Sequence, residues 1–266
     1  MITDAQRRFW VDNGYLIVEG VLDAERVEEL RQALEARHAF EGARAGSEGS
    51  DNPGVRRLCN LFSKGRPFER LGIEPIALEM ARLAIGDDFR WQAMNFHDPL
   101  PHDPRCHQSI HADRSFFPGC TGYLNVVWVL DPMTVANGAT RIVPGSHRRP
   151  WPLDLPDGKA KVEGEICAEC GAGAAVFIHG DCWHGGRANG TDAPRRVIHM
   201  GFACPATPPQ YEIAGAISAG TRARLGDLAW LVPETLDRYG YSDDPTRGRS
   251  IDTILAERRG EAAPRH

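Results

Sequence analysis

The strongest constraint on the fold is a series of short apolar or alternating runs in the middle of the chain. The runs span residues 89–96, 123–130, 140–143, 174–178 and 197–204. Turn-forming pairs such as Asp131-Pro132, Asn137-Gly138 and Pro144-Gly145 separate them. No long helical pattern lies between these runs, so a parallel α/β sheet is not indicated. The sequence therefore predicts a mainly β fold of the jelly-roll type with flanking helices.

Helices are expected before the strand-rich region. Thr3 and Gln6 have the spacing of a capping box at a helix start, and residues 15–18 then have the character of a strand. Asp23 can cap a second helix, whose apolar face would consist of Val27, Leu30 and Leu34. A further helix is expected over 75–85, with proline at its start and glycine after its end. These helices would pack on the outside of the β fold.

The domain organisation is predicted to be simple. With 266 residues and no visible internal repeat, the chain is expected to form one domain, 1–266. Within it, residues 1–88 would support the β core at 89–204, and residues 205–266 would form a helical extension. Polar and glycine-rich composition predicts a loop at 41–54. Short helices are expected at 225–230 and 250–257, followed by a frayed tail at 260–266.

Charge and composition exclude several classes of partner. The net charge of −5 argues against a general nucleic-acid binder or a protein of anionic membrane surfaces. No apolar run approaches the length of a membrane span, and the N-terminus lacks the pattern of a signal peptide. We therefore expect a cytoplasmic protein whose partner is a small molecule, and the sequence gives no indication of oligomeric state.

The cysteines do not form a recognisable framework. There are seven, at positions 59, 106, 120, 167, 170, 182 and 204, and without an export signal they are expected to be reduced thiols. Cys167 and Cys170 form a lone CxxC pair. Since a structural zinc site would need further ligands at suitable spacing, this pair is interpreted as incidental.

The residues with the clearest chemical meaning are His111-Ala112-Asp113, followed by His184 and Arg195. Two histidines and one carboxylate can occupy one face of an iron(II) ion and leave other coordination positions open. On an extended segment His111 and Asp113 would point the same way, with Ala112 facing away. Arg195 offers a planar, permanently charged group suited to binding a carboxylate. Together they predict a non-haem iron oxygenase.

A second His-x-Asp tripeptide, His179-Gly180-Asp181, competes with the first as a source of ligands. One such tripeptide is expected by chance in a chain with ten histidines, so neither is specific alone. His179 ends an apolar run and Gly180-Asp181 resembles a turn, whereas His111 is followed by several strands before His184. Two alternatives remain: a non-catalytic jelly-roll metal-binding or sensing protein, and a metal-dependent cupin isomerase or hydrolase.

These residues resemble the phytanoyl-CoA dioxygenase family. The resemblance rests on His111-Ala-Asp113, on Asn137-Gly-Ala-Thr-Arg-Ile-Val-Pro-Gly-Ser-His147, and on Trp183-His184-Gly-Gly with Arg195. It extends from the N-terminus to about residue 204. Members are iron(II)- and 2-oxoglutarate-dependent oxygenases on a double-stranded β-helix, the cupin-like form of the jelly roll. The resemblance implies an oxidoreductase that uses Fe(II), with 2-oxoglutarate and O2 as co-substrates, and that releases succinate and CO2.

The resemblance also implies roles for individual residues. His111, Asp113 and His184 would hold iron, and Arg195 would bind the distal carboxylate of 2-oxoglutarate, with Arg196 as the alternative if the strand register differs by one residue. Further 2-oxoglutarate contacts are expected from Thr140 and Gln108. Gly186 stands where some relatives have a serine beside the arginine. Because relatives that halogenate lack the carboxylate, Asp113 makes a halogenase unexpected.

The substrate is less constrained than the cofactors. A CoA thioester would favour a basic cluster beside the motif, which the sequence does not show. We expect hydroxylation or oxidative cyclisation of a small molecule in natural-product or antibiotic biosynthesis. Candidate substrate contacts are Trp91, Arg105, Phe116 and Trp128.

Overall fold

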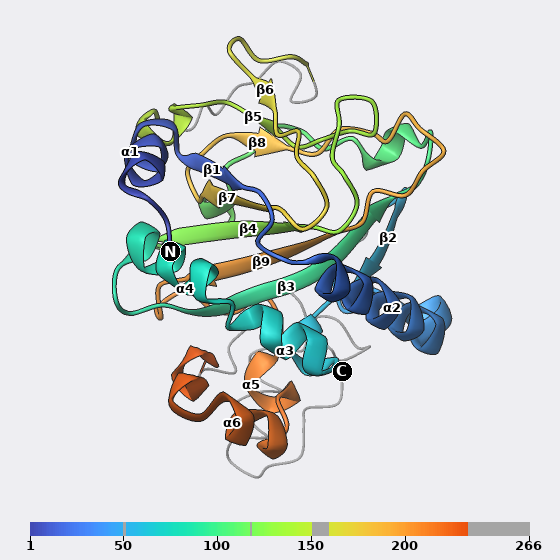
Figure 1. Ribbon diagram of the computed structural model, residues 1–266, viewed down its shortest axis with the longest axis vertical. Coiled ribbons are helices and arrows are strands. Elements are labelled where there is room, and N and C mark those ends of the chain that lie inside the picture. The colour runs from blue at the N-terminus through green and yellow to red at the C-terminus, as the bar shows by residue number, and fades with distance from the viewer. Residues whose placement is uncertain (50–51, 118, 151–159, 234–266) are drawn as a thin grey trace, which may run out of the picture.

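The computed structural model describes residues 1–49, 52–117, 119–150 and 160–233. Its framework is two antiparallel sheets that face each other (Figure 1). The larger sheet has six strands in the order β1 (Tyr15–Val18), β7 (Ala175–His179), β4 (Tyr123–Val129), β9 (Val197–Ala203), β3 (Arg90–Pro99) and β2 (Val55–Leu58). The smaller sheet has the order β6 (Ile166–Cys167), β5 (Arg141–Ile142) and β8 (His184–Gly185).

The two faces of the larger sheet bury different cores. In β4, Leu124, Val126 and Trp128 belong to the core beneath the helices, whereas Val127 and Val129 belong to the core between the sheets. This division follows from the two-residue period of a strand, which sends alternate side chains to opposite faces. Both faces are covered, so every residue of β4 is buried and the strand lacks a polar alternation. The face between the sheets is the one that leads to the functional site.

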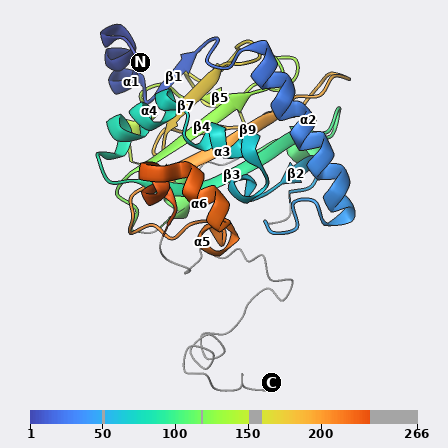
Figure 2. The same cartoon turned by 60° about the horizontal axis from the view of Figure 1, so that its bottom comes forward.

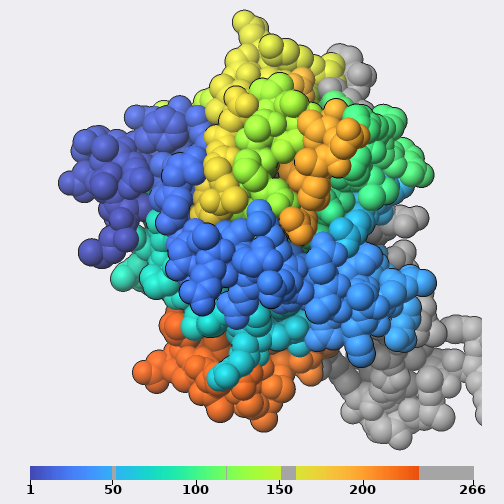
Figure 3. All heavy atoms as spheres, turned by 45° about the vertical axis from the view of Figure 1, so that its right-hand side comes forward, coloured from blue at the N-terminus to red at the C-terminus, as the bar shows by residue number. Residues whose placement is uncertain are grey.

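Helices cover the outer face of the larger sheet (Figure 2). They are α2 (Ala24–Glu41), α3 (Arg66–Gly72), α4 (Pro75–Ile85), α5 (Ile213–Ala216) and α6 (Ala219–Leu225), whereas α1 (Asp4–Asn13) lies at the edge of the sheet beside β1. Short 3-10 helices lie at Gly42–Arg44, Leu61–Ser63, Pro104–Cys106, Asp113–Phe116, Ser146–Arg148 and Gly226–Leu231. In Figure 3 the N-terminal segment lies between the strand-rich part of the molecule and the C-terminal helices. The described residues contain no helix with the length and apolar character needed to cross a bilayer.

Several helices and strands were predicted correctly from local sequence patterns. Thr3 and Gln6 form both hydrogen bonds of a capping box, and Asp23 caps α2 by accepting from the backbone N–H of Arg26. The strand at 15–18 and the helix at 75–85 have the predicted bounds. All seven cysteines are free, as expected for thiols, and burial raises the pKa of Cys170 to about 12.

Other elements were missed or lie elsewhere. β2 and α3 were not predicted, since the Val-Arg-Arg-Leu sequence of β2 lacks an apolar alternation. The segment predicted as a loop at 41–54 begins with the last residue of α2 and a 3-10 turn. The helix predicted at 225–230 is a 3-10 helix at Gly226–Leu231. The helix predicted at 250–257 and the tail at 260–266 fall outside the described residues.

Candidate metal centre and 2-oxoglutarate pocket

His111, Asp113 and His184 come together at the wall of one cavity. Their potential ligand atoms all lie within 4.8 Å of one another. His111 and His184 form an antiparallel bridge through backbone hydrogen bonds of 2.8 and 2.9 Å, and Asp113 begins the 3-10 helix Asp113–Phe116. Ala112 is extended and packs in an apolar cluster on the other side. Residues 111–113 therefore do not form a regular strand: His111 lies in a β-bridge and Asp113 begins a 3-10 helix. The side chains of His111 and Asp113 nevertheless point toward the same site, as predicted for a strand.

Backbone carbonyls orient both imidazoles. The Nδ1 atom of His111 lies 2.9 Å from the carbonyl of Ser109, and Nδ1 of His184 lies 2.9 Å from the carbonyl of Cys182. A carbonyl can only accept, so each Nδ1 carries the proton and each Nε2 offers a lone pair. Both Nε2 atoms lie 3.5 Å from oxygens of Asp113. The donor set thus fits a divalent iron ion held on one face.

The carboxylate of Asp113 is held in its ionised form. Burial alone would raise its pKa, but His184, His111 and the Asn125 amide together hold the pKa well below its usual range. The Asn125 side chain donates a 2.8 Å hydrogen bond to Asp113 Oδ2 from β4. Asn125 was not predicted from the sequence. Its signal was weak, since it is one polar residue in an otherwise apolar strand.

The competing His179-Gly180-Asp181 tripeptide has a different environment. Asp181 forms a 2.6 Å ion pair with Arg114, and the ring of His179 packs near Trp10 and His147. Among the described residues, only the His111, Asp113 and His184 group brings three histidine, cysteine or acidic side chains together this closely.

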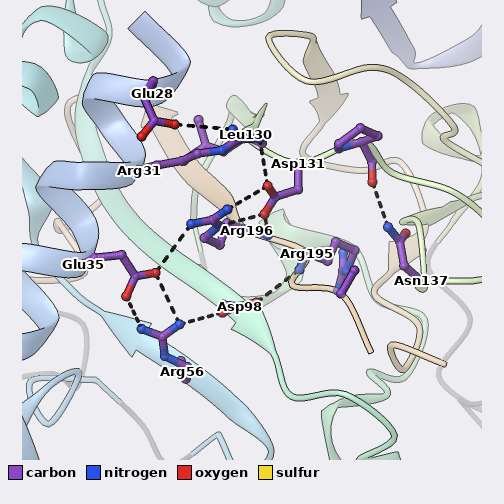
Figure 4. Close-up of polar contacts among 12 residues, drawn as sticks. Glu28, Arg31, Glu35, Arg56, Asp98, Leu130, Asp131, Asn137, Arg195 and Arg196 are labelled. Atoms are coloured by element: carbon purple, nitrogen blue, oxygen red, sulfur yellow. Dashed lines mark hydrogen bonds and ion pairs between the residues drawn. The ribbon is translucent and has the colours of Figure 1, made fainter. Parts of the chain in front are cut away.

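Arg195 and Arg196 have opposite orientations at the start of β9 (Figure 4). Arg195 lines the same cavity as the three candidate ligands and is 4% exposed. Its Nε has no hydrogen-bond partner among the described residues, and burial lowers its pKa to about 10. Arg196 faces outward and makes a bidentate pair with Asp131 at 2.8 and 2.9 Å. The register therefore turns Arg195 toward the cavity, and Arg196 is part of a surface ion-pair network.

The cavity has a volume of about 770 Å³ and is lined by both other residues expected near 2-oxoglutarate. Thr140 is buried at its wall. Gln108 Oε1 accepts a 2.8 Å hydrogen bond from the backbone N–H of Gly186, which ties the Gln108 segment to the chain beyond β8. A Cβ atom at Gly186 would lie 3.0 Å from that same Oε1 atom. Glycine at 186 thus leaves room for Gln108 beside Arg195.

The four residues predicted as substrate contacts divide into two pairs. Arg105 and Phe116 line the cavity. Trp91 and Trp128 instead lie in the core beneath the helices, on the opposite face of the larger sheet, and this corrects their expected placement. Trp91 stacks on Phe62 with ring centroids 4.2 Å apart and donates a 2.9 Å hydrogen bond to the carbonyl of Gly72. For Trp128, strand parity decides this, since Asn125 of the same strand faces the cavity. For Trp91, the β-bulge between Trp91 and Ala93 decides it, because the extra residue turns Trp91 away from the cavity face that Asn95 and His97 occupy.

Further basic side chains line the cavity from strands of the larger sheet. They are Arg57, His97 and His199, on β2, β3 and β9. Strand alternation from Arg195 would have placed His199, four residues later, on the same face of β9.

The comparisons with known proteins agree with this geometry. The model of the phytanoyl-CoA dioxygenase family matches residues 10–197, which include every residue of the metal centre and Arg195. The chain belongs to the phytanoyl-CoA dioxygenase family. The predicted family is thereby confirmed, and with it the class of enzyme: an iron(II)- and 2-oxoglutarate-dependent dioxygenase, an oxidoreductase.

Two fungal relatives carry matching names. Dioxygenase af480 of Aspergillus fumigatus is 28% identical over 74% of this chain and 66% of its own length. The Fe(II)/2-oxoglutarate-dependent dioxygenase nvfF of Aspergillus novofumigatus is 29% identical over 76% of this chain and 72% of its own. The chain therefore spans about two thirds to three quarters of the length of these relatives.

A solved structure confirms the fold. The non-heme alpha ketoglutarate dependent carbocyclase SnoK from nogalamycin biosynthesis superposes with a TM-score of 0.65 at 19% identity, over 93% of this chain and 94% of that one. At this identity the likeness shows the fold alone. Together with the two facing sheets, it confirms the predicted double-stranded β-helix.

Proposed function

We propose that this dioxygenase oxidises a small molecule of secondary metabolism, by hydroxylation or oxidative cyclisation, at an iron(II) ion held by His111, Asp113 and His184. The observation that carries the proposal is the convergence of these three side chains and buried Arg195 on one cavity. The names of the fungal dioxygenases support the reaction class, and the name of the carbocyclase from nogalamycin biosynthesis supports the substrate class.

Each residue has a distinct task in this scheme. His111 and His184 present Nε2 lone pairs fixed by their Nδ1 hydrogen bonds, and Asp113 supplies the anionic ligand. When bound, the iron couples oxidative decarboxylation of 2-oxoglutarate by O2 to oxidation of a substrate C–H bond. Asn125 acts through Asp113, because its hydrogen bond to Oδ2 fixes the orientation of the carboxylate, whose two oxygens face His184 and His111.

Arg195 is the proposed partner of the distal carboxylate of 2-oxoglutarate. A buried guanidinium whose Nε lacks a partner is destabilised by desolvation, and a bound carboxylate would offset that cost through charge-assisted hydrogen bonds. Thr140 and Gln108 are proposed to complete the 2-oxoglutarate contacts from the same cavity. A metal-binding protein without turnover, or a cupin isomerase or hydrolase, has no need for this buried cation, which favours the oxygenase.

An anaerobic titration tests the proposed site. Adding Fe(II) and then 2-oxoglutarate to the purified protein should give a visible charge-transfer band, and admission of O2 should then release succinate. A folded, iron-loaded protein that gives neither the band nor succinate would contradict the proposal. Zn(II) in place of Fe(II) is the control, since it should bind without producing the band.

A further inference from the structure

Two cysteines lie beside the cavity wall, and the proposed function uses neither of them. Cys120 precedes β4 and Cys204 follows β9, and these two strands are paired in the larger sheet with Tyr123 opposite Ala203. The carbonyl oxygen of Gly122 accepts from the backbone N–H of Cys204 at 3.1 Å and from the thiol of Cys120 at 3.2 Å. Strand pairing therefore brings two cysteines that are far apart in the sequence to one end of the sheet.

The hydroxyl of Thr207 contacts the sulfur atoms of both cysteines. It lies 3.1 Å from Sγ of Cys204, and it also forms a hydrogen bond with the thiol of Cys120. The thiol of Cys120 forms a further side-chain hydrogen bond with Cys204, so the two sulfurs are neighbours. Both cysteines are free thiols in this structure. Since a disulfide can form only between cysteines whose sulfurs can approach each other, this pair has the required proximity.

The two thiols differ in acidity and in exposure. Burial alone would raise the pKa of the Cys204 thiol, but hydrogen bonds with its neighbours lower this pKa to about 6. These bonds come from the side chains of Thr207 and Thr121 and from the backbone of Thr121 and Gly122. Cys204 is also partly exposed, whereas Cys120 is 3% exposed and burial raises its pKa. The thiolate is the reactive form of cysteine, so Cys204 is the nucleophile and Cys120 is its protonated neighbour.

We propose that Cys204 and Cys120 form a modification site, a dithiol that hydrogen peroxide oxidises to a disulfide. The Cys204 thiolate attacks one oxygen of the peroxide, the O–O bond breaks and hydroxide leaves, which gives a sulfenic acid. The thiol of Cys120 then attacks the sulfur of Cys204, the S–O bond breaks, and water leaves with the proton of Cys120. The two cysteines together lose two electrons and two protons, and the peroxide is reduced to two molecules of water.

The disulfide would join the wall of the cavity to the end of β9. Cys120 follows the 3-10 helix that begins at Asp113, and its carbonyl oxygen accepts a 3.0 Å hydrogen bond from the guanidinium of Arg114. Phe117 stacks on Tyr123 with ring centroids 5.3 Å apart, and both rings line the cavity. Oxidation would therefore restrain the part of the wall that follows Asp113 and would leave all three candidate metal ligands in place.

Oxidation of the full-length protein tests the dithiol, with Zn(II) in place of Fe(II) so that peroxide does not react with iron. After treatment with a small molar excess of hydrogen peroxide at neutral pH, the remaining thiols are blocked with N-ethylmaleimide under denaturing conditions and the protein is digested with trypsin. Cleavage after arginine places Cys120 in the peptide 115–141 and Cys204 in the peptide 197–222, each with a single cysteine. Mass spectrometry should find these two peptides linked with the loss of two hydrogens, and dithiothreitol should separate them.

Single variants separate the roles of the two cysteines. Cys204→Ser should abolish the link, and Cys120→Ser should leave a sulfenic acid at Cys204 that dimedone traps. The control Cys170→Ser removes one cysteine of the CxxC pair and should leave the link between Cys120 and Cys204 unchanged. In the reduced wild type, iodoacetamide should alkylate Cys204 at least tenfold faster than Cys170, because burial raises the pKa of Cys170 to about 12.

The peptide map of the wild type decides the proposal even if a variant fails to fold. Recovery of peptides 115–141 and 197–222 with their cysteines still blocked by maleimide overturns the proposal. Alkylation of Cys204 that is no faster than that of Cys170 also overturns it. Neither result involves iron or 2-oxoglutarate, so both are independent of the proposed function.

Discussion

Arg195 and Arg196 are adjacent in the chain, yet one faces the cavity and the other pairs with Asp131 on the outside (Figure 4). Asp98 helps to fix this arrangement, because its carboxylate accepts from the backbone N–H of Arg195 and pairs with Arg56 at 3.0 Å. The Arg56 guanidinium reaches Glu35 on α2, which also lies 3.6 Å from Arg196. The direction of Arg195 is therefore supported by a network on the opposite side of the sheet.

Because Arg195 and Arg196 point in opposite directions, substitutions at the two positions should have different effects on 2-oxoglutarate binding. Arg195→Met should weaken 2-oxoglutarate binding about tenfold to a hundredfold, since a hydrogen bond to a charged group is worth about 1.5–3 kcal/mol. Arg196→Met should leave that affinity within about twofold and lower thermal stability slightly. Calorimetric titration with 2-oxoglutarate on the anaerobic iron-loaded proteins measures both. Equal losses in the two variants would mean that the assignment of Arg195 is wrong.

The two His-x-Asp tripeptides can be separated in the same way. Asp113→Ala should abolish Fe(II) binding and succinate formation, because it removes the anionic ligand of the proposed site. Asp181→Ala removes a partner of Arg114 and His179 outside the proposed site, so iron binding should persist. Metal content after gel filtration and succinate release provide the measurement. Full activity in Asp113→Ala would mean that the metal centre lies elsewhere in the protein.

The backbone geometry of the loop before Thr140 predicts a stability effect at Gly138. Its φ is +83°, and a Cβ there would lie 2.4 Å from the backbone carbonyl oxygen of Ala188. Gly138→Ala should therefore cost at least about 3 kcal/mol of unfolding free energy. Gly20 also has a positive φ, of +64°, but open space around it, so Gly20→Ala should cost only about 1 kcal/mol. Urea unfolding measures the free energy of unfolding of both variants. Similar losses of stability in the two would show that the loop around Gly138 rearranges to accommodate the added Cβ atom.

A pH-dependent contribution to stability is predicted at His179. Burial lowers its pKa to about 4 from an ordinary value of 6.5, so the unfolded chain binds the proton more readily than the folded one. The stability that neutral His179 provides is complete above pH 6.5 and is lost as the pH falls toward 4. Relative to His179→Gln, the wild type should lose up to about 1.4 kcal/mol per pH unit in that window. The prediction would be contradicted if the free energy of unfolding changed with pH in the same way in the wild type and in His179→Gln.

Local physical chemistry accounts for what could be predicted from the sequence. The capping residues Thr3 and Asp23 and the proline that starts α4 act within one helical turn, so their effect does not depend on distant residues. The short strands with turns between them indicated the jelly roll. The spacing of His111 and Asp113, with His184 and Arg195 downstream, indicated the ligands and the cation of the site.

Tertiary structure decided which face each side chain occupies. Trp128 and Asn125 lie on one strand, but parity sends the tryptophan to the helix-side core and the amide to Asp113. β2 could not be predicted, since its arginines are stabilised by partners distant in the chain: Arg56 by Glu35 and Asp98. Arg57, His97 and His199 likewise line one cavity only because the strand order brings β2, β3 and β9 together. The sequence specifies the types of metal ligand and the local periodicity of helices and strands. The set of polar and charged side chains inside a cavity depends on which strands the fold brings together.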